Sequence, residues 1–194
     1  MEGEGVIVTD GILLTHGAVF SKDAPLLIGL DKALSALGLT VERFNLPYRQ
    51  RQAEGPPPAG SMPEDLEGLR TAVAAMRERV DGRLILGGQS YGGLLGSMLA
   101  AGDPALVDGL MLFPYPLHPP GGELNTGHFS ALRTPALFIH GTRDPMGSVE
   151  EMRTALKAIP ARTELLAIEG EAHQLNPARV AEPATAAFQR FYLG

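Results

Sequence analysis

The serine at position 90 stands where its hydroxyl could act as a nucleophile. Residues 88–92 read Gly-Gln-Ser-Tyr-Gly, the G-x-S-x-G pattern of a serine at the apex of a sharp strand-to-helix turn. Such a turn strains the serine backbone, so the residues two before and two after it need almost no side chain, and here both are glycine. The chemistry this pattern indicates is acyl transfer, in which the Ser90 hydroxyl attacks a carbonyl carbon.

The residues around the serine fit the same interpretation. Residues 84–86 are a short apolar run, as expected of a buried strand, and residues 91–101 are small or apolar without proline, as expected of a helix. The N-terminus of that helix would favour negative charge developing beside Ser90. An ordinary glycine-rich turn with an incidental serine has the same five letters, so the interpretation depends on a base and an acid elsewhere in the chain.

A serine hydroxyl needs a base within hydrogen-bonding reach. In the order that accompanies this turn, an acid follows the serine and the histidine comes last. Only one of the five histidines lies in the loop after the last predicted strand (residues 163–168) and also follows a suitable carboxylate. That histidine is His173; the others are His16, His118, His128 and His140. Alone, His173 would pass for a surface-loop residue.

The acid that best fits the order is Asp144. It follows a predicted strand at 136–140, in the turn His-Gly-Thr-Arg-Asp-Pro. Asp103 and Asp108 precede a strand and so belong at the opposite edge of the sheet, whereas Glu123 follows one and is the alternative acid. Asp144 alone would pass for a turn or helix-cap residue. The agreement of role, order and sheet edge favours Ser90, His173 and Asp144 acting together.

A second loop is expected to complete an oxyanion hole. The predicted strand at 12–14 ends in Thr-His-Gly-Ala, and we expect the backbone N–H groups of Ala18 and Tyr91 to bind the developing oxyanion. His16, which precedes the serine, is expected to brace this loop. The chemistry requires no metal and no organic cofactor.

The predicted elements explain why these segments meet. Strands at 12–14, 40–46, 84–86, 107–113, 136–140 and 163–168 alternate with helices at 24–37, 61–80, 91–101, 148–159 and from 177 onward. A further apolar run at 6–8 precedes an expected turn or bulge at Asp10 and Gly11, and Ser61 is a candidate cap. This alternation predicts one α/β domain over residues 1–194, with a mostly parallel, doubly wound sheet flanked by helices. Ligands bind at the carboxyl ends of such strands.

Loops at that edge supply candidates for a substrate pocket. Residues 47–58, which include three consecutive prolines, are expected to form a long, stiff loop. Its Arg49 and Arg51 would contact an anionic substrate, or else belong to a basic, solvated loop. Residues 121–134 are too short and irregular for a cap domain, so an open site is expected. The candidate pocket residues are Gly17, Tyr48, Arg49, Gln89, Tyr115 and His118.

Composition restricts the partners. The net charge of −6 and the absence of a basic run argue against nucleic acid. Apolar runs fall well short of the roughly 18 residues of a membrane span, and the acidic first five residues do not resemble a secretory signal. With no cysteine there is no disulfide framework and no thiolate chemistry. A cytoplasmic enzyme acting on a small molecule is therefore expected; a homodimer is compatible with the sequence but not indicated by it.

Four segments together resemble a small, cap-less α/β-hydrolase from residue 12 onward. They are Leu-Thr-His-Gly-Ala at 14–18, Phe-Asn-Leu-Pro-Tyr at 44–48 with the prolines at 56–58, Gly-Gly-Gln-Ser-Tyr-Gly at 87–92, and Tyr-Pro-Leu-His-Pro at 115–119. The chain is similar to the predicted-hydrolase group related to the NSL-complex regulatory subunit and to dienelactone-hydrolase-like proteins.

The resemblance implies Ser90 as nucleophile, Asp144 as acid and His173 as base. Dienelactone hydrolases commonly use a cysteine, so the serine argues against a dienelactone substrate. We therefore expect a serine hydrolase acting on a small carboxylic ester or thioester. Two alternatives stay open: an inactive binding or scaffold module, as in the nuclear relatives that serve as complex subunits, and an acyltransferase or cofactor-free peroxidase with the same three residues.

Overall fold

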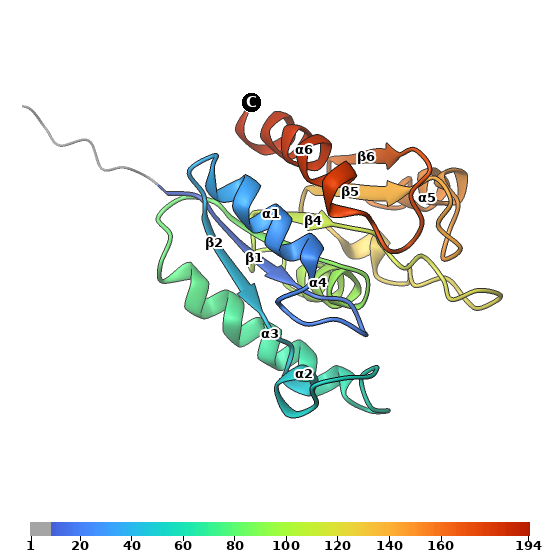
Figure 1. Ribbon diagram of the computed structural model, residues 1–194, viewed down its shortest axis with the longest axis horizontal. Coiled ribbons are helices and arrows are strands. Elements are labelled where there is room, and N and C mark those ends of the chain that lie inside the picture. Colours follow the sequence, from blue (N-terminus) through green and yellow to red (C-terminus); the bar gives the residue numbers. More distant parts are fainter. Residues whose placement is uncertain (1–8) are drawn as a thin grey trace, which may run out of the picture.

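A computed structural model describes residues 9–194 of the chain as a layered α/β structure around one sheet (Figure 1). The strand order is β2-β1-β3-β4-β5-β6, and each neighbouring pair is parallel. The strands are β1 (Gly11–Thr15), β2 (Thr40–Phe44), β3 (Leu84–Gly88), β4 (Gly109–Leu112), β5 (Ala136–Gly141) and β6 (Thr163–Ile168). The mostly parallel sheet predicted from the sequence is therefore confirmed.

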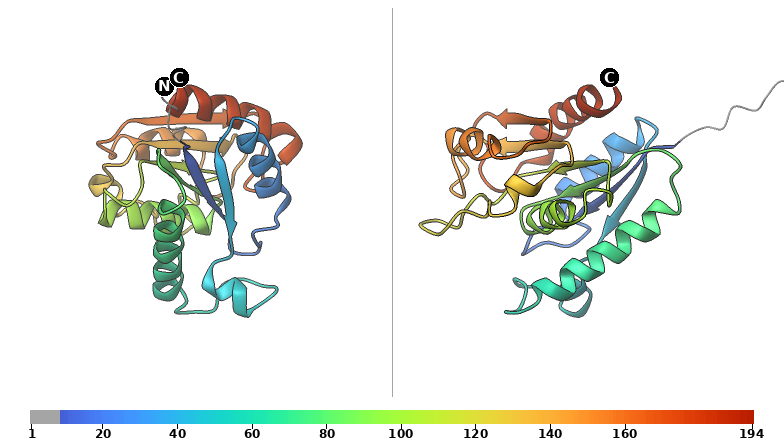
Figure 2. Two further views of the ribbon diagram at one scale, coloured as in Figure 1. Left: turned by 90° about the vertical axis from the view of Figure 1, so that its left-hand side faces the viewer. Right: turned by 180° about the vertical axis from the view of Figure 1, so that it is seen from behind.

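Helices cover both faces of the sheet (Figures 1 and 2). One face packs against α1 (Pro25–Ser35) and α6 (Pro177–Phe188), the other against α3 (Met62–Arg77), α4 (Tyr91–Gly102) and α5 (Val149–Leu156). Successive side chains of a strand point to opposite faces of the sheet, which explains the two hydrophobic cores. Leu13 of β1 packs on the side of α3, α4 and α5, while Ile12 and Leu14 pack on the side of α1 and α6. All three of these side chains are fully buried, as expected for a central parallel strand.

Three local expectations were wrong. Residues 47–51 are not loop but a short helix, α2 (Pro47–Arg51), which begins with proline at a position that needs no N–H donor. Gly11 belongs to β1 rather than to a turn, and its N–H donates to the Arg83 carbonyl at 2.8 Å. The Ser61 hydroxyl donates to the Pro58 carbonyl instead of capping α3. The apolar run expected at 6–8 lies outside the described residues.

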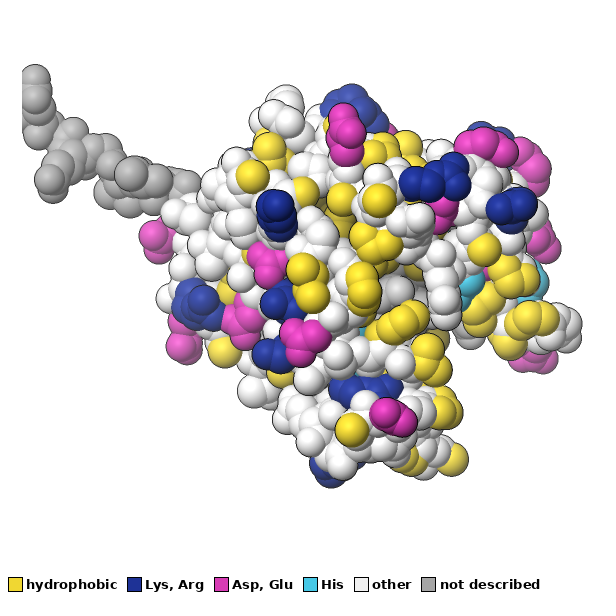
Figure 3. Space-filling model, in the orientation of Figure 1, with side chains coloured by type: hydrophobic (Ala, Val, Ile, Leu, Met, Phe, Trp, Pro, Cys, Tyr) yellow, Lys and Arg dark blue, Asp and Glu magenta, His cyan; other side chains and the backbone are white. Residues whose placement is uncertain are grey.

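Loops at the carboxyl ends of the strands are left uncovered by any large insertion. Between β4 and β5 the only helical turn is the short 3₁₀ segment Phe129–Ala131, so residues 9–194 carry no helical cap domain. On the face seen in Figure 3, basic and acidic side chains are interspersed. Within the described residues, every helix is too short or too polar to cross a bilayer.

Candidate active site

The turn between β3 and α4 holds Ser90 in a conformation that few non-glycine residues adopt. Its backbone has φ 49° and ψ −112°, and it is the single non-glycine residue with positive φ within residues 9–194. Such a conformation costs on the order of 1–3 kcal/mol and persists where the surrounding structure enforces it. Glycine is required on both sides, because a Cβ at Gly88 would lie 2.5 Å from the Gly93 backbone and one at Gly92 would lie 2.7 Å from the His16 carbonyl oxygen.

Three side chains from the ends of three strands form a hydrogen-bonded line. The Ser90 Oγ lies 2.8 Å from His173 Nε2, and His173 Nδ1 lies 2.8 Å from Asp144 Oδ2. Ser90 follows β3, Asp144 follows β5 and His173 follows β6. The structure therefore brings together the three residues that the sequence order had selected. Glu123, the alternative acid, lies exposed in the loop after β4 and has no part in this line.

The Asp144 carboxylate is held in place by more than the histidine. Its side chain is fully buried, and its Oδ1 accepts a hydrogen bond of 2.8 Å from the Met146 N–H. The neighbouring His140 is also buried, with Nε2 donating to the Gly147 carbonyl at 2.7 Å. The His140 Nδ1 has no hydrogen-bond partner among residues 9–194 and lies 3.7 Å from Asp144 Oδ2. Each carboxylate oxygen of Asp144 thus has its own partner, Oδ1 the Met146 N–H and Oδ2 the Nδ1 of His173.

The loop after β1 reaches the other side of Ser90. A Cβ built on Gly17 would lie 3.3 Å from the Ser90 Cβ, so the backbone of the loop passes directly beside the turn that carries Ser90. The Ala18 N–H has no backbone acceptor among the described residues. Tyr91 is the first residue of α4, where an N–H group has no acceptor within its own helix. Both amides expected to bind an oxyanion are therefore placed on segments adjoining Ser90.

Two residues expected in the substrate pocket instead hold this loop. Tyr48 is buried, and its hydroxyl donates to the Ala18 carbonyl at 2.8 Å. Arg49 is also buried, and its guanidinium donates to four backbone carbonyls, those of Ala18, Phe20, Gln52 and Gly55. Because these bonds occupy the guanidinium, Arg49 is not a substrate contact in this structure. Arg51, the second candidate for an anionic substrate, pairs with Glu64 on the surface.

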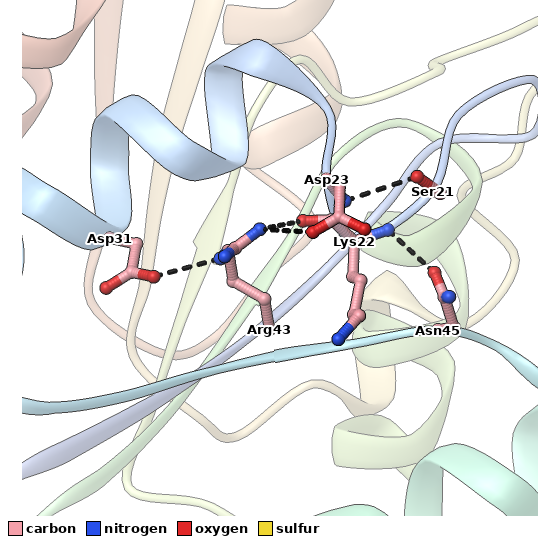
Figure 4. A network of polar contacts seen from close by, with 6 residues as sticks. All are labelled: Ser21, Lys22, Asp23, Asp31, Arg43 and Asn45. Carbon is pink, nitrogen blue, oxygen red and sulfur yellow. Dashed lines mark hydrogen bonds and ion pairs between the residues drawn. The ribbon is translucent and has the colours of Figure 1, made fainter.

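A second set of polar contacts fixes the far end of the same loop (Figure 4). Arg43 on β2 donates to Asp23 and to Asp31, both at 2.9 Å, and to the Lys22 carbonyl at 2.7 Å. The Asn45 side chain accepts from the Lys22 N–H at 2.7 Å. Contacts from β2 and α2 thus constrain the loop after β1 along most of its length, which suits donors that must be in place before a reaction starts.

His16 braces the loop as the sequence predicted, and its tautomer follows from its partners. Its Nε2 accepts the Leu46 N–H at 3.1 Å, so Nδ1 carries the proton and donates to the Gly17 carbonyl at 2.9 Å. Burial lowers the pKa of His16 from 6.5 to about 4, and the nearby Arg49 charge acts in the same direction. The folded protein therefore stabilises the neutral form of the His16 ring.

This lowered pKa predicts a loss of stability in mild acid. Because the unfolded chain binds the proton more readily, stability is fully present above pH 6.5 and declines as the pH falls toward about 4. The expected contribution is on the order of 3 kcal/mol. Urea unfolding at pH 7 and pH 5 should show a smaller pH effect in His16→Gln than in wild type. In the control His118→Gln the wild-type pH effect should persist; equal pH effects in His16→Gln and wild type would contradict the assignment.

A cavity of about 210 Å³ opens beside the serine. Of the six candidate pocket residues, Gly17 and Gln89 line it. Besides Tyr48 and Arg49, Tyr115 and His118 also lie elsewhere. Tyr115 is buried and donates to the Asn125 carbonyl, while His118 lies 3.6 Å from Glu151 of α5. The other lining residues are Ala18, Val19, Phe20, Ser90, Met146, His173 and Gln174.

Four of these lining residues were not among the predicted site residues. Val19 and Phe20 follow Ala18, Met146 lies two residues after Asp144, and Gln174 follows His173. Their closeness in sequence to the predicted site residues could have identified them, because neighbouring loop residues lie at the same edge of the sheet. A smaller cavity of about 140 Å³ adjoins the first and shares Phe20, Gln89 and Gln174 with it. The walls of the larger cavity are mostly apolar, and His173 is its only titratable lining residue within the described part of the chain.

The fold and the arrangement at the strand ends agree with the family comparison. The model of the α/β-hydrolase domain family matches residues 9–188, and the chain belongs to this family.

The individual proteins that match the chain share only low sequence identity with it. The chain is 26% identical over 175 residues to ABHD14B of Rattus norvegicus, named as a candidate protein-lysine deacylase; the match covers 88% of this chain and 78% of the rat protein. Among solved structures, a dienelactone hydrolase from Anabaena variabilis is similar with a TM-score of 0.76 and 19% identity, covering 96% of this chain and 88% of that one. TT1662 from Thermus thermophilus has a TM-score of 0.73 and 22% identity, with 95% and 90% covered. At this identity the structures support the fold alone.

Proposed function

We propose that the protein is a serine hydrolase that cleaves small carboxylic esters or thioesters through an acyl-enzyme on Ser90. The observation that carries the proposal is the line of two 2.8 Å contacts from Ser90 through His173 to Asp144. In this mechanism His173 takes the proton from the serine as the Oγ attacks the substrate carbonyl. The Asp144 carboxylate holds the imidazole with its proton on Nδ1 and stabilises the imidazolium that forms.

The tetrahedral intermediate would be stabilised by the N–H groups of Ala18 and Tyr91, each worth about 3 kcal/mol in comparable sites. Collapse expels the alcohol or thiol, which takes the proton from His173. Water, activated by the same histidine, then attacks the acyl-enzyme and releases the acid. Support for this assignment of donors comes from the close approach of Gly17 to Ser90 and from the position of Tyr91 at the start of α4.

The test is turnover of a short-chain p-nitrophenyl ester together with labelling by a fluorophosphonate probe. A serine hydrolase gives both. A folded protein that shows neither would instead favour the binding or scaffold function. A protein that transfers the acyl group to an added alcohol or amine faster than to water would be an acyltransferase.

The limited volume and apolar walls of the cavity predict how the rate of hydrolysis depends on the length of the acyl chain. Each methylene that enters the apolar cavity should gain about 0.8 kcal/mol, so kcat/KM should rise by about fourfold per carbon until the space is filled and then fall. A series of p-nitrophenyl esters from acetate to dodecanoate measures this profile. Met146→Ala should move the optimum to longer chains, whereas Leu124→Ala, an exposed residue outside the cavity, should not. An unchanged optimum in Met146→Ala would place the acyl chain elsewhere.

A second candidate substrate is an acylated lysine side chain. The observation that favours it is the match to rat ABHD14B over 88% of this chain, since that protein is named as a candidate protein-lysine deacylase. The same nucleophile and base would attack an amide carbonyl. Release of acetate from an acetyl-lysine peptide, compared with release from a short ester, distinguishes the two substrates.

A further inference from the structure

Asp65 of α3 is a buried carboxylate with no role in the chemistry described above. Its exposed fraction is 0%, yet it forms no ion pair with any residue in 9–194. Its two oxygens accept hydrogen bonds from different elements. Oδ1 accepts the backbone N–H of Tyr48 at 2.9 Å, and Oδ2 accepts the Tyr91 hydroxyl at 3.0 Å.

Each of these two donors leads to one side of the proposed oxyanion hole. Tyr91 contributes one of the two N–H groups itself. Tyr48 leads to the other, because its hydroxyl donates to the carbonyl of Ala18 at 2.8 Å and approaches that of Gly17 at 3.3 Å. The two tyrosine rings also pack edge to face, with their centroids 6.0 Å apart. A continuous series of contacts thus runs from Tyr91 through Asp65 and Tyr48 to Ala18.

The geometry points to Asp65 as a positioning residue that fixes the separation of the Ala18 and Tyr91 amides. The inference rests on the proposed function. Oxyanion donors stabilise a transition state only when they are already aimed at the developing charge. The Ala18 amide lies in the loop after β1 and the Tyr91 amide begins α4, more than 70 residues later in the chain. Backbone hydrogen bonds join the two segments, such as that from the Gly92 N–H to the His16 carbonyl at 3.2 Å, and the contacts of Asp65 add a side-chain connection between them. Asp65 contacts both supporting tyrosines, and hydrogen bonds to a carboxylate are stronger than those between neutral groups.

The decisive variant is Asp65→Ala, which removes both contacts. Misplacing a catalytic group by about 1 Å can cost a hundredfold in rate, so we expect kcat to fall by roughly tenfold to a hundredfold while KM stays within about twofold. Asp65→Asn should restore most of the activity, because its oxygen can accept the Tyr48 N–H while its NH₂ donates to the Tyr91 oxygen. Tyr91→Phe breaks only one of the contacts and should give a smaller fall in kcat.

A second readout separates positioning from simple stabilisation. A trifluoromethyl ketone adds to a catalytic serine as an oxyanion-bearing hemiketal, so its affinity should fall in Asp65→Ala by the same factor as kcat/KM. The matched control is Asp108→Ala. This carboxylate accepts the Leu84 N–H at 2.8 Å and pairs with Arg77 at the opposite edge of the sheet. Its loss should lower the melting temperature without changing kcat or the affinity for the ketone.

The outcomes are distinct. Wild-type kcat and ketone affinity in a folded Asp65→Ala protein would overturn the inference while leaving the proposed function intact. If Asp65→Ala does not fold, Tyr91→Phe decides, and unchanged kcat and ketone affinity in that variant would overturn it equally. A wild-type protein without ester turnover or fluorophosphonate labelling would overturn the proposed function and this inference with it.

Discussion

Replacing Ser90 with alanine is expected to lower kcat for ester hydrolysis by about 10⁶-fold, the loss typical of removing the nucleophile from a serine–histidine–aspartate site. Without the Oγ no acyl-enzyme forms, and only binding and oxyanion stabilisation are left to assist attack by water. The variant should stay folded, since alanine keeps the Cβ that the turn already accommodates. Turnover of p-nitrophenyl acetate, fluorophosphonate labelling and the intact mass of the labelled protein measure the loss.

Ser97 provides a matched control for this variant. It lies in α4, the helix that directly follows Ser90, and its Oγ is also 2.8 Å from a histidine nitrogen, that of His128. Ser97 is fully buried, however, and its hydroxyl donates to the Leu94 carbonyl. Ser97→Ala should therefore keep wild-type labelling and turnover. Labelling that persists in Ser90→Ala would show that Ser90 is not the nucleophile.

The positions of the three aligned residues could be predicted because they depend on local sequence and on chain order. Each follows a short predicted strand, and the carboxyl ends of parallel strands meet at one edge of a sheet. Ser90 also carries its own signal, since the flanking glycines reflect a backbone conformation that the structure shows at φ 49°. Asp144 and His173 follow from the βα alternation together with the order of serine, acid and histidine that accompanies this turn.

The residues that support the site could not be predicted in this way. Tyr48 and Arg49 lie in a proline-rich segment that is expected from the sequence to be an exposed loop, but both side chains bind carbonyls some 30 residues earlier in the chain. From the sequence, Asp65 is an ordinary acidic residue in the first turn of a helix, where its negative charge would interact favourably with the helix dipole. Its partners, Tyr48 and Tyr91, come from two other elements. Polar side chains that bind distant backbone leave no periodic pattern in the sequence.

Asp144→Asn is expected to lower kcat by about 10⁴-fold while leaving the fold intact, through the proton on His173. The carboxylate serves two donors at once, the Met146 N–H at Oδ1 and His173 Nδ1 at Oδ2. An asparagine has only one oxygen. If that oxygen keeps the Met146 N–H, the NH₂ group faces His173, and the unpartnered Nδ1 of His140 lies on the same side to accept from it. His173 must then carry its proton on Nε2, where it cannot accept one from Ser90.

The control for this variant is the other carboxylate that follows a strand in the expected order. Glu123→Gln should leave kcat unchanged, because Glu123 is exposed and takes no part in the hydrogen bonds that join Ser90, His173 and Asp144. Steady-state kinetics with p-nitrophenyl acetate, with circular dichroism to verify folding, compare the two variants. A large loss in Glu123→Gln together with a small one in Asp144→Asn would transfer the role of the acid to the loop after β4. The opposite result would support Asp144 as the acid that orients His173.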